Sequence, residues 1–176
     1  MTIEQNAAGI LINKQTVSGV TAVNFINLRG YSSYSLIMNN MQRATAGATV
    51  NTILQVSINN GVSYITTGYL GASEHSDITQ NTWTGTTSVS NGMSLVPTAL
   101  GAGTTGFAVQ GNLLNMNATT GYIFCSATCI YYDGVNAYRY YNSSYYTTVN
   151  TNANTFRIVG DVGGTFSGTI TLYGSV

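Results

Sequence analysis

The stretch GGTFSGTITLY, residues 163–173, decides the fold class of this chain. Phe166, Ile170 and Leu172 all fall on even positions, and hydroxyl residues occupy the odd positions beside them. Side chains alternate between the two faces of a β-strand, so the pattern predicts a strand with one apolar and one polar face. No segment shows a convincing apolar period of 3.6 over ten residues, and we therefore expect a nearly all-β protein.

The same alternation recurs along the chain and predicts eight or nine strands. Gly- and Asn-rich turns separate the strands, and the chain has a single proline. These features favour an antiparallel two-sheet β-sandwich of jelly-roll type. We expect one domain over residues 1–176, with residues 1–16 as an extended N-terminal arm. Outside two hairpins, the predicted strands are 17–28, 34–39, 86–96, 106–116 and 155–159, and long loops are expected at 41–48 and 71–85.

The first hairpin is expected to pair residues 50–58 with residues 62–69. A three-residue loop, Asn59-Asn60-Gly61, keeps apolar residues opposite apolar ones, whereas a two-residue loop does not. Gly61 then supplies the left-handed residue that such loops require.

The second hairpin is expected to pair residues 121–132 with residues 135–141 across Asp133-Gly134. Asp-Gly is a strong signal for a two-residue turn. The resulting register predicts one face that packs small residues against tyrosines and a second face that is partly exposed. The first face pairs Cys129 with Tyr138 and Ala127 with Tyr140; the second pairs Ile130 with Ala137, Thr128 with Arg139 and Ser126 with Tyr141.

Cys125 and Cys129 are the two cysteines of the chain. Four residues along one strand place them about 13 Å apart. A disulfide needs Cα atoms within about 7 Å, so we expect two buried free thiols. Neither has the second Cys pair or the His that a zinc site needs, and we predict no metal and no cofactor.

The charge balance excludes several kinds of partner. Five basic residues oppose five acidic ones, and charged residues make up 6% of the chain. A nucleic-acid partner needs a stripe of Lys and Arg, which five scattered basic residues cannot build. No apolar run is long enough for a membrane span, and the start lacks the basic and apolar regions of a signal peptide, so we expect folding in the cytoplasm and no membrane insertion.

The densest ionisable cluster is Glu74, His75 and Asp77. A His oriented by a carboxylate can serve as a general acid/base or a metal ligand. Neighbouring polar residues in a loop rich in Gly, Ser and Thr are more often simply solvated, and we favour that interpretation.

Other catalytic patterns are absent or incomplete. A glycosidase needs two carboxylates about 5 to 9 Å apart in a cleft, and the chain has five acidic residues. No Gly-x-Ser-x-Gly elbow is present. Residues 101–106, GAGTTG, have the outline of a dinucleotide motif, but no βαβ pattern surrounds them. We therefore predict a protein without enzymatic activity.

The tyrosines are in excess, with seven of the 13 between residues 131 and 146. Exposed aromatic rings beside Asn and Ser side chains can stack on sugar rings and bind their hydroxyls. The alternative is that alternate tyrosines fill the core or a subunit interface. For a ligand- or partner-binding surface we select the outward side of the second hairpin and one residue of a separate loop: Thr128, Arg139, Tyr141 and Trp83.

Several segments resemble small tailed-bacteriophage virion proteins. These segments are residues 23–28 (VNFINL), 31–38 (YSSYSLIM), 44–48 (ATAGA), 54–61 (LQVSINNG) and 168–174 (GTITLYG). Val62 departs from the pattern, because a second glycine often stands there. The shared motifs are structural, so no catalytic residue is carried over.

The resemblance implies a non-enzymatic structural protein of the virion, displayed on the tail or capsid and contributing to host attachment. Two alternatives stay open: a carbohydrate-binding or receptor-binding module for a host surface glycan, and a capsid decoration protein without a ligand. We expect other virion proteins as partners and a homo-oligomer, with a trimer favoured by analogy with phage fibres.

Overall fold

The computed structural model describes residues 9–43, 51–77, 82–96, 106–117, 120–132, 138–148, 152–160 and 163–175. These residues form twelve β-strands, and none of them belongs to a helix able to cross a membrane. The strands are β1 (Ile10–Val20), β2 (Ala22–Phe25), β3 (Ser33–Arg43), β4 (Thr52–Ser57), β5 (Tyr69–Asp77), β6 (Thr82–Ser90), β7 (Met93–Val96), β8 (Gly106–Leu114), β9 (Phe124–Tyr132), β10 (Tyr138–Thr147), β11 (Thr155–Gly160) and β12 (Phe166–Ser175).

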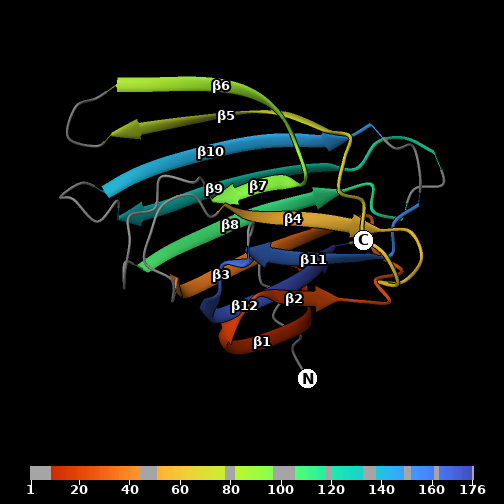
Figure 1. Cartoon of the computed structure of the whole chain (residues 1–176). Helices are drawn as coiled ribbons and strands as arrows, with labels where there is room; N and C mark the ends of the chain where they lie inside the picture. The colour runs from red at the N-terminus through yellow and green to blue at the C-terminus, as the bar shows by residue number, and fades with distance from the viewer. Residues whose placement is uncertain are drawn as a thin grey trace.

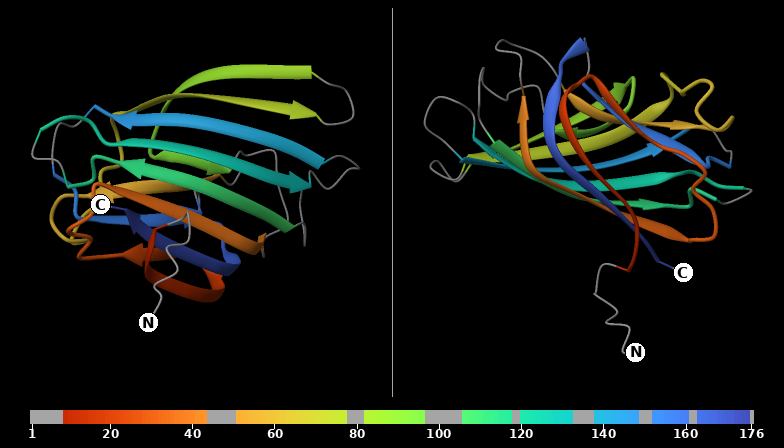
Figure 2. Two further views of the ribbon diagram at one scale, coloured as in Figure 1. Left: turned by 180° about the vertical axis from the view of Figure 1, so that it is seen from behind. Right: turned by 90° about the horizontal axis from the view of Figure 1, so that it is seen from below.

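The strands make two antiparallel sheets, which confirms the predicted all-β class. The larger sheet has eight strands in the order β1-β12-β3-β8-β9-β10-β5-β6, and the smaller has four in the order β2-β11-β4-β7. Figure 1 shows the smaller sheet in front of the larger one, and the view from below in Figure 2 shows how the larger sheet bends. The two sheets therefore form two layers with one core between them.

The expected count of eight or nine strands is wrong. The predicted strands 17–28 and 86–96 are each divided into two, because the chain leaves one sheet and enters the other at Thr21 and at Asn91-Gly92. Of the expected loop 71–85, residues 71–77 instead belong to β5 and residues 82–85 to β6, two strands that pair with each other; residues 78–81 lie outside the described residues. Residues 10–16 of the expected arm belong to β1, which pairs with β12 at the edge of the larger sheet.

The apolar face predicted for β12 is confirmed. Phe166, Ile170 and Leu172 are buried in the core. Phe25 of β2 stacks on Phe156 of β11 with ring centroids 4.8 Å apart. Even spacing of apolar residues was thus sufficient to identify the face that packs inward.

The first predicted hairpin is wrong. β4 pairs with β11 on one side and β7 on the other, so neither edge is free to take residues 62–69. Residues 58–68 form a loop, in which Gly61 has the expected positive φ of 87°. Ser57 Oγ accepts hydrogen bonds from the backbone N–H groups of Asn59 and Gly61, at 3.3 and 2.9 Å.

The second predicted hairpin exists as β9 and β10, but its register differs by three residues. Tyr141 lies opposite Cys129, and Tyr145 lies opposite Cys125. The turn Asp133-Gly134 lies outside the described residues. An odd shift exchanges the two faces of β10, so Cys129 faces Tyr141 in the core rather than the predicted Tyr138.

Both cysteines are free and buried, as expected from their spacing. They lie on the core face of β9, and burial raises the pKa of each thiol to about 12. A thiol with such a pKa stays protonated and unreactive near neutral pH.

Candidate functional site

The outer face of the larger sheet carries a strip of polar side chains. On β8 and β9, buried and exposed residues alternate, and the exposed ones are on the face turned away from the core. Asn112, Ser126 and Ser144 face one another across β8, β9 and β10. One row further along the strands, Gln110, Thr128, Asn142 and Glu74 lie side by side on β8, β9, β10 and β5. These seven residues, which we call the polar strip, line a hollow of about 500 Å³.

Hydrogen bonds hold parts of the polar strip in defined orientations. Thr128 Oγ1 donates to Asn142 Oδ1 over 2.9 Å, and Asn142 Nδ2 donates to Glu74 Oε1 over 3.3 Å. Ser35 Oγ donates to Asn112 Oδ1 over 2.9 Å. The first two bonds fix the orientation of the Asn142 amide, with its oxygen toward Thr128 and its nitrogen toward Glu74. Gln110, Ser126 and Ser144 are exposed to solvent.

Apolar and aromatic residues border the polar strip on one side. Leu114, Phe124 and Tyr146 occupy the next row of the sheet, and Leu114 and Phe124 are 47% and 43% exposed. The Tyr146 ring packs at 5.6 Å from Tyr122 and 6.2 Å from Phe124, measured between ring centroids. A ligand lying on the polar strip would therefore meet aromatic rings at its edge.

On the other side of the polar strip, Ile130 and Tyr140 lie opposite each other, and Tyr140 lies opposite Ser76. Trp83 is the next member of this row, because it pairs with Ser76. The structure thus places Trp83 on β6, the edge strand, rather than on the loop that the sequence suggested.

The surface predicted from Thr128, Arg139 and Tyr141 is not formed. Thr128 belongs to the polar strip, but Tyr141 is on the core face and is 3% exposed. Its hydroxyl donates to Ser94 Oγ over 2.9 Å, and burial raises its pKa to about 12. Arg139 lies opposite Asp77, so the expectation of a neutral partner, Thr128, across the strand is also wrong. The three-residue change of register between β9 and β10 explains the position of Tyr141. The pairing of β10 with β5 on its other side places Arg139 opposite Asp77.

Glu74, His75 and Asp77 do not share one face. They lie on β5, where successive residues point to opposite sides of the sheet. Glu74 is in the polar strip, whereas His75 and Asp77 pair with Tyr141 and Arg139 of the other face. In the part of the chain that the structure describes, no three His, Cys, Asp or Glu side chains gather as they would around a metal.

Four residues of the polar strip were missed by the sequence analysis: Gln110, Asn112, Asn142 and Ser144. Ser126 was placed on the exposed face of the second hairpin but was not selected as a site residue. The exposed positions of Gln110 and Asn112 could have been predicted, because apolar and polar residues alternate in the segment 106–114, GFAVQGNLL, as they do in residues 163–173. The positions of Asn142 and Ser144 depend on the register of β10, and that register was predicted incorrectly from a two-residue turn.

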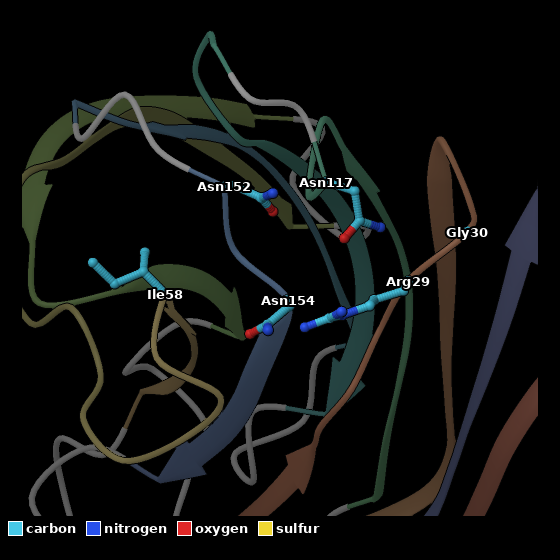
Figure 3. A pocket seen from close by; sticks show the side chains of 6 residues that line it. All are labelled: Arg29, Gly30, Ile58, Asn117, Asn152 and Asn154. Carbon is cyan, nitrogen blue, oxygen red and sulfur yellow. The ribbon is translucent and has the colours of Figure 1, made fainter.

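A second pocket lies among loops at one end of the two sheets (Figure 3). It has a volume of about 470 Å³ and is lined by Arg29, Gly30, Ile58, Asn117, Asn152 and Asn154, which we call the loop-end pocket. The backbone holds its wall together, since Leu28 N donates to Asn154 O over 2.8 Å and Ala153 N donates to Met116 O over 2.9 Å. None of its residues belongs to the polar strip.

Comparison with known proteins adds little. No protein-family model and no curated protein matches this chain. Among solved structures, it is similar to scytalido-glutamic peptidase with a transition state analog inhibitor, at 8% identity and a TM-score of 0.31; the match covers 87% of this chain and 66% of the peptidase. An aerolysin-like protein from Bombina maxima matches at 13% identity and a TM-score of 0.14, over 83% of this chain and 86% of that protein. At these TM-scores neither likeness bears on the fold or activity of the chain.

Proposed function

We propose that this protein is a non-enzymatic binding protein that holds an uncharged glycan on the polar strip. The observation that carries the proposal is the combination of neutral amide and hydroxyl groups with an aromatic border on one open sheet face. Sugars are bound by this combination, because hydroxyls exchange hydrogen bonds with amides while ring C–H groups pack on aromatic faces.

The dimensions and charge of the polar strip favour a neutral oligosaccharide. From β8 to β5 it crosses three strand spacings, or about 14 Å. Glu74 is its one charged member, and a carboxylate accepts hydrogen bonds from sugar hydroxyls but repels phosphate and other anions. A single carboxylate also lacks the second acidic group that glycoside hydrolysis uses, which supports a binding role over an enzymatic one.

A glycan-binding screen tests this proposal. Purified protein is presented with neutral and acidic oligosaccharides, and we expect binding to a subset of the neutral ones. Failure of every neutral glycan at millimolar concentration would contradict the proposal.

We further propose that the protein is a virion structural protein displayed on a phage tail or capsid, where glycan binding contributes to host attachment. The support is the sequence resemblance together with a surface rich in Thr, Ser and Asn and poor in charge. Mass spectrometry of separated heads and tails tests this assignment, and absence of the chain from purified particles would contradict it.

Two finer assignments belong to the same proposal. The first is a jelly-roll-like sandwich, supported by the chain passing between sheets from β1 to β2, from β3 to β4 and from β4 to β5. The second is a homotrimer, supported by exposed apolar side chains such as Ile10 and Leu11 on the edge strand β1. Analytical ultracentrifugation tests the trimer, which a monomer at all concentrations would contradict.

A further inference from the structure

We infer that the loop-end pocket binds an acidic sugar residue, with the carboxylate at Arg29 and hydroxyls at the surrounding asparagines. This site is separate from the polar strip, so the inference stands or falls independently of neutral-glycan binding there.

Arg29 gives the pocket its preference for an anion. Among the six described residues that line the pocket it is the one charged residue, and it is exposed. Figure 3 shows its side chain running across the pocket toward Asn154. A guanidinium can donate two parallel hydrogen bonds to a carboxylate, a geometry that a neutral sugar does not offer.

Asn117 gives the pocket a hydrogen-bond acceptor of defined orientation. Its Nδ2 donates to Tyr31 O over 3.2 Å and to Tyr34 Oη over 3.0 Å, which uses both amide protons. Figure 3 shows the amide nitrogen turned away and the oxygen toward the pocket. A hydroxyl group of a ligand can donate a hydrogen bond to this oxygen.

Ile58 provides an apolar surface at the rim and is 50% exposed. The C–H groups of a sugar ring can pack against such a side chain. One cation, one oriented acceptor and one apolar side chain together match a hexuronic acid residue, which carries one carboxylate, several hydroxyls and ring C–H groups.

Titration with glucuronate, followed by backbone amide NMR, tests the inference. We expect saturable shifts at Arg29, Asn152 and Asn154, and binding of glucose that is weaker by about ten-fold or more, since it lacks the charge-assisted pair. Arg29→Gln should weaken glucuronate binding by about ten-fold while leaving the thermal midpoint unchanged. Lys14→Gln, which removes an exposed cation from β1, is the matched control and should bind as the parent does.

Three results would overturn the inference. One is equal affinity for glucose and glucuronate, and another is unchanged affinity in Arg29→Gln. The third is binding of acetate or N-acetylalanine as tightly as glucuronate, because the pocket would then recognise the carboxylate alone and make no contact specific to the sugar ring.

Discussion

Thr128 Oγ1 donates a 2.9 Å hydrogen bond to Asn142 Oδ1 across β9 and β10, at the centre of the polar strip. The bond leaves the Asn142 amide with one orientation, in which its nitrogen faces Glu74. A ligand therefore meets an amide that is already oriented, and less conformational entropy is lost on binding.

Replacement of Thr128 by Val tests this orientation. Valine keeps the shape but removes the hydroxyl, so Asn142 is free to rotate and we expect neutral-glycan affinity to fall about five-fold, or roughly 1 kcal/mol. Thr16→Val is a matched control, because Thr16 is an exposed strand threonine with a hydroxyl 3.3 Å from that of Thr169. A loss of affinity that is equal in both variants, measured by calorimetry, would argue against the role of Thr128.

Tyr141→Phe should destabilise the fold and leave the surface unchanged. The variant removes the hydrogen bond to Ser94 Oγ inside the core, at an expected cost of about 1 kcal/mol in the free energy of unfolding. Tyr122→Phe, at an exposed position, should change that free energy by less than about 0.5 kcal/mol. Urea denaturation measures both, and an unchanged stability of Tyr141→Phe would contradict the buried position.

Gly168→Ala should also be destabilising, by about 2 kcal/mol. Gly168 has a φ of 143°, sits at a register irregularity between β12 and β3, and would place a Cβ 2.9 Å from the backbone oxygen of Asn40. Gly106→Ala is the control, because its Cβ would have no neighbour nearer than 3.7 Å. Equal thermal midpoints for the two variants would show that the irregularity tolerates a side chain.

The stability of the fold should fall as pH rises from about 9 to 12. Burial raises the pKa of Cys125 and Cys129 from 9.0 to about 12, and that of Tyr69 and Tyr141 from 10.0 to about 12. In this range the unfolded chain loses protons that the folded chain keeps, so the unfolded state is favoured. Burial lowers the pKa of Arg43 to about 10, which acts in the opposite direction but involves one group against four.

Urea midpoints at a series of pH values measure this dependence. A variant with both Cys125→Ala and Cys129→Ala removes the thiol contribution and should lose less stability between pH 9 and 11. A parent protein whose midpoint is constant over that range would contradict the burial of these groups.

The sequence predicted which face of a strand is buried more reliably than which strands pair and in which register. Alternation identified the buried side of β12 and the antiparallel all-β class, because burial of every second residue is a local property. The β9–β10 register was wrong because it was derived from a two-residue turn at Asp133-Gly134, whereas in the structure Tyr141 pairs with Cys129. The polar strip joins residues of four strands whose neighbours depend on sheet order, which no local pattern encodes.

Amide chemical-shift mapping with a neutral oligosaccharide tests whether the polar strip is the glycan-binding surface. We expect saturable shifts concentrated at Gln110, Thr128 and Asn142, and their loss in Asn142→Ala. Shifts confined to other surfaces, or binding by Asn142→Ala as tight as that of the parent protein, would contradict it.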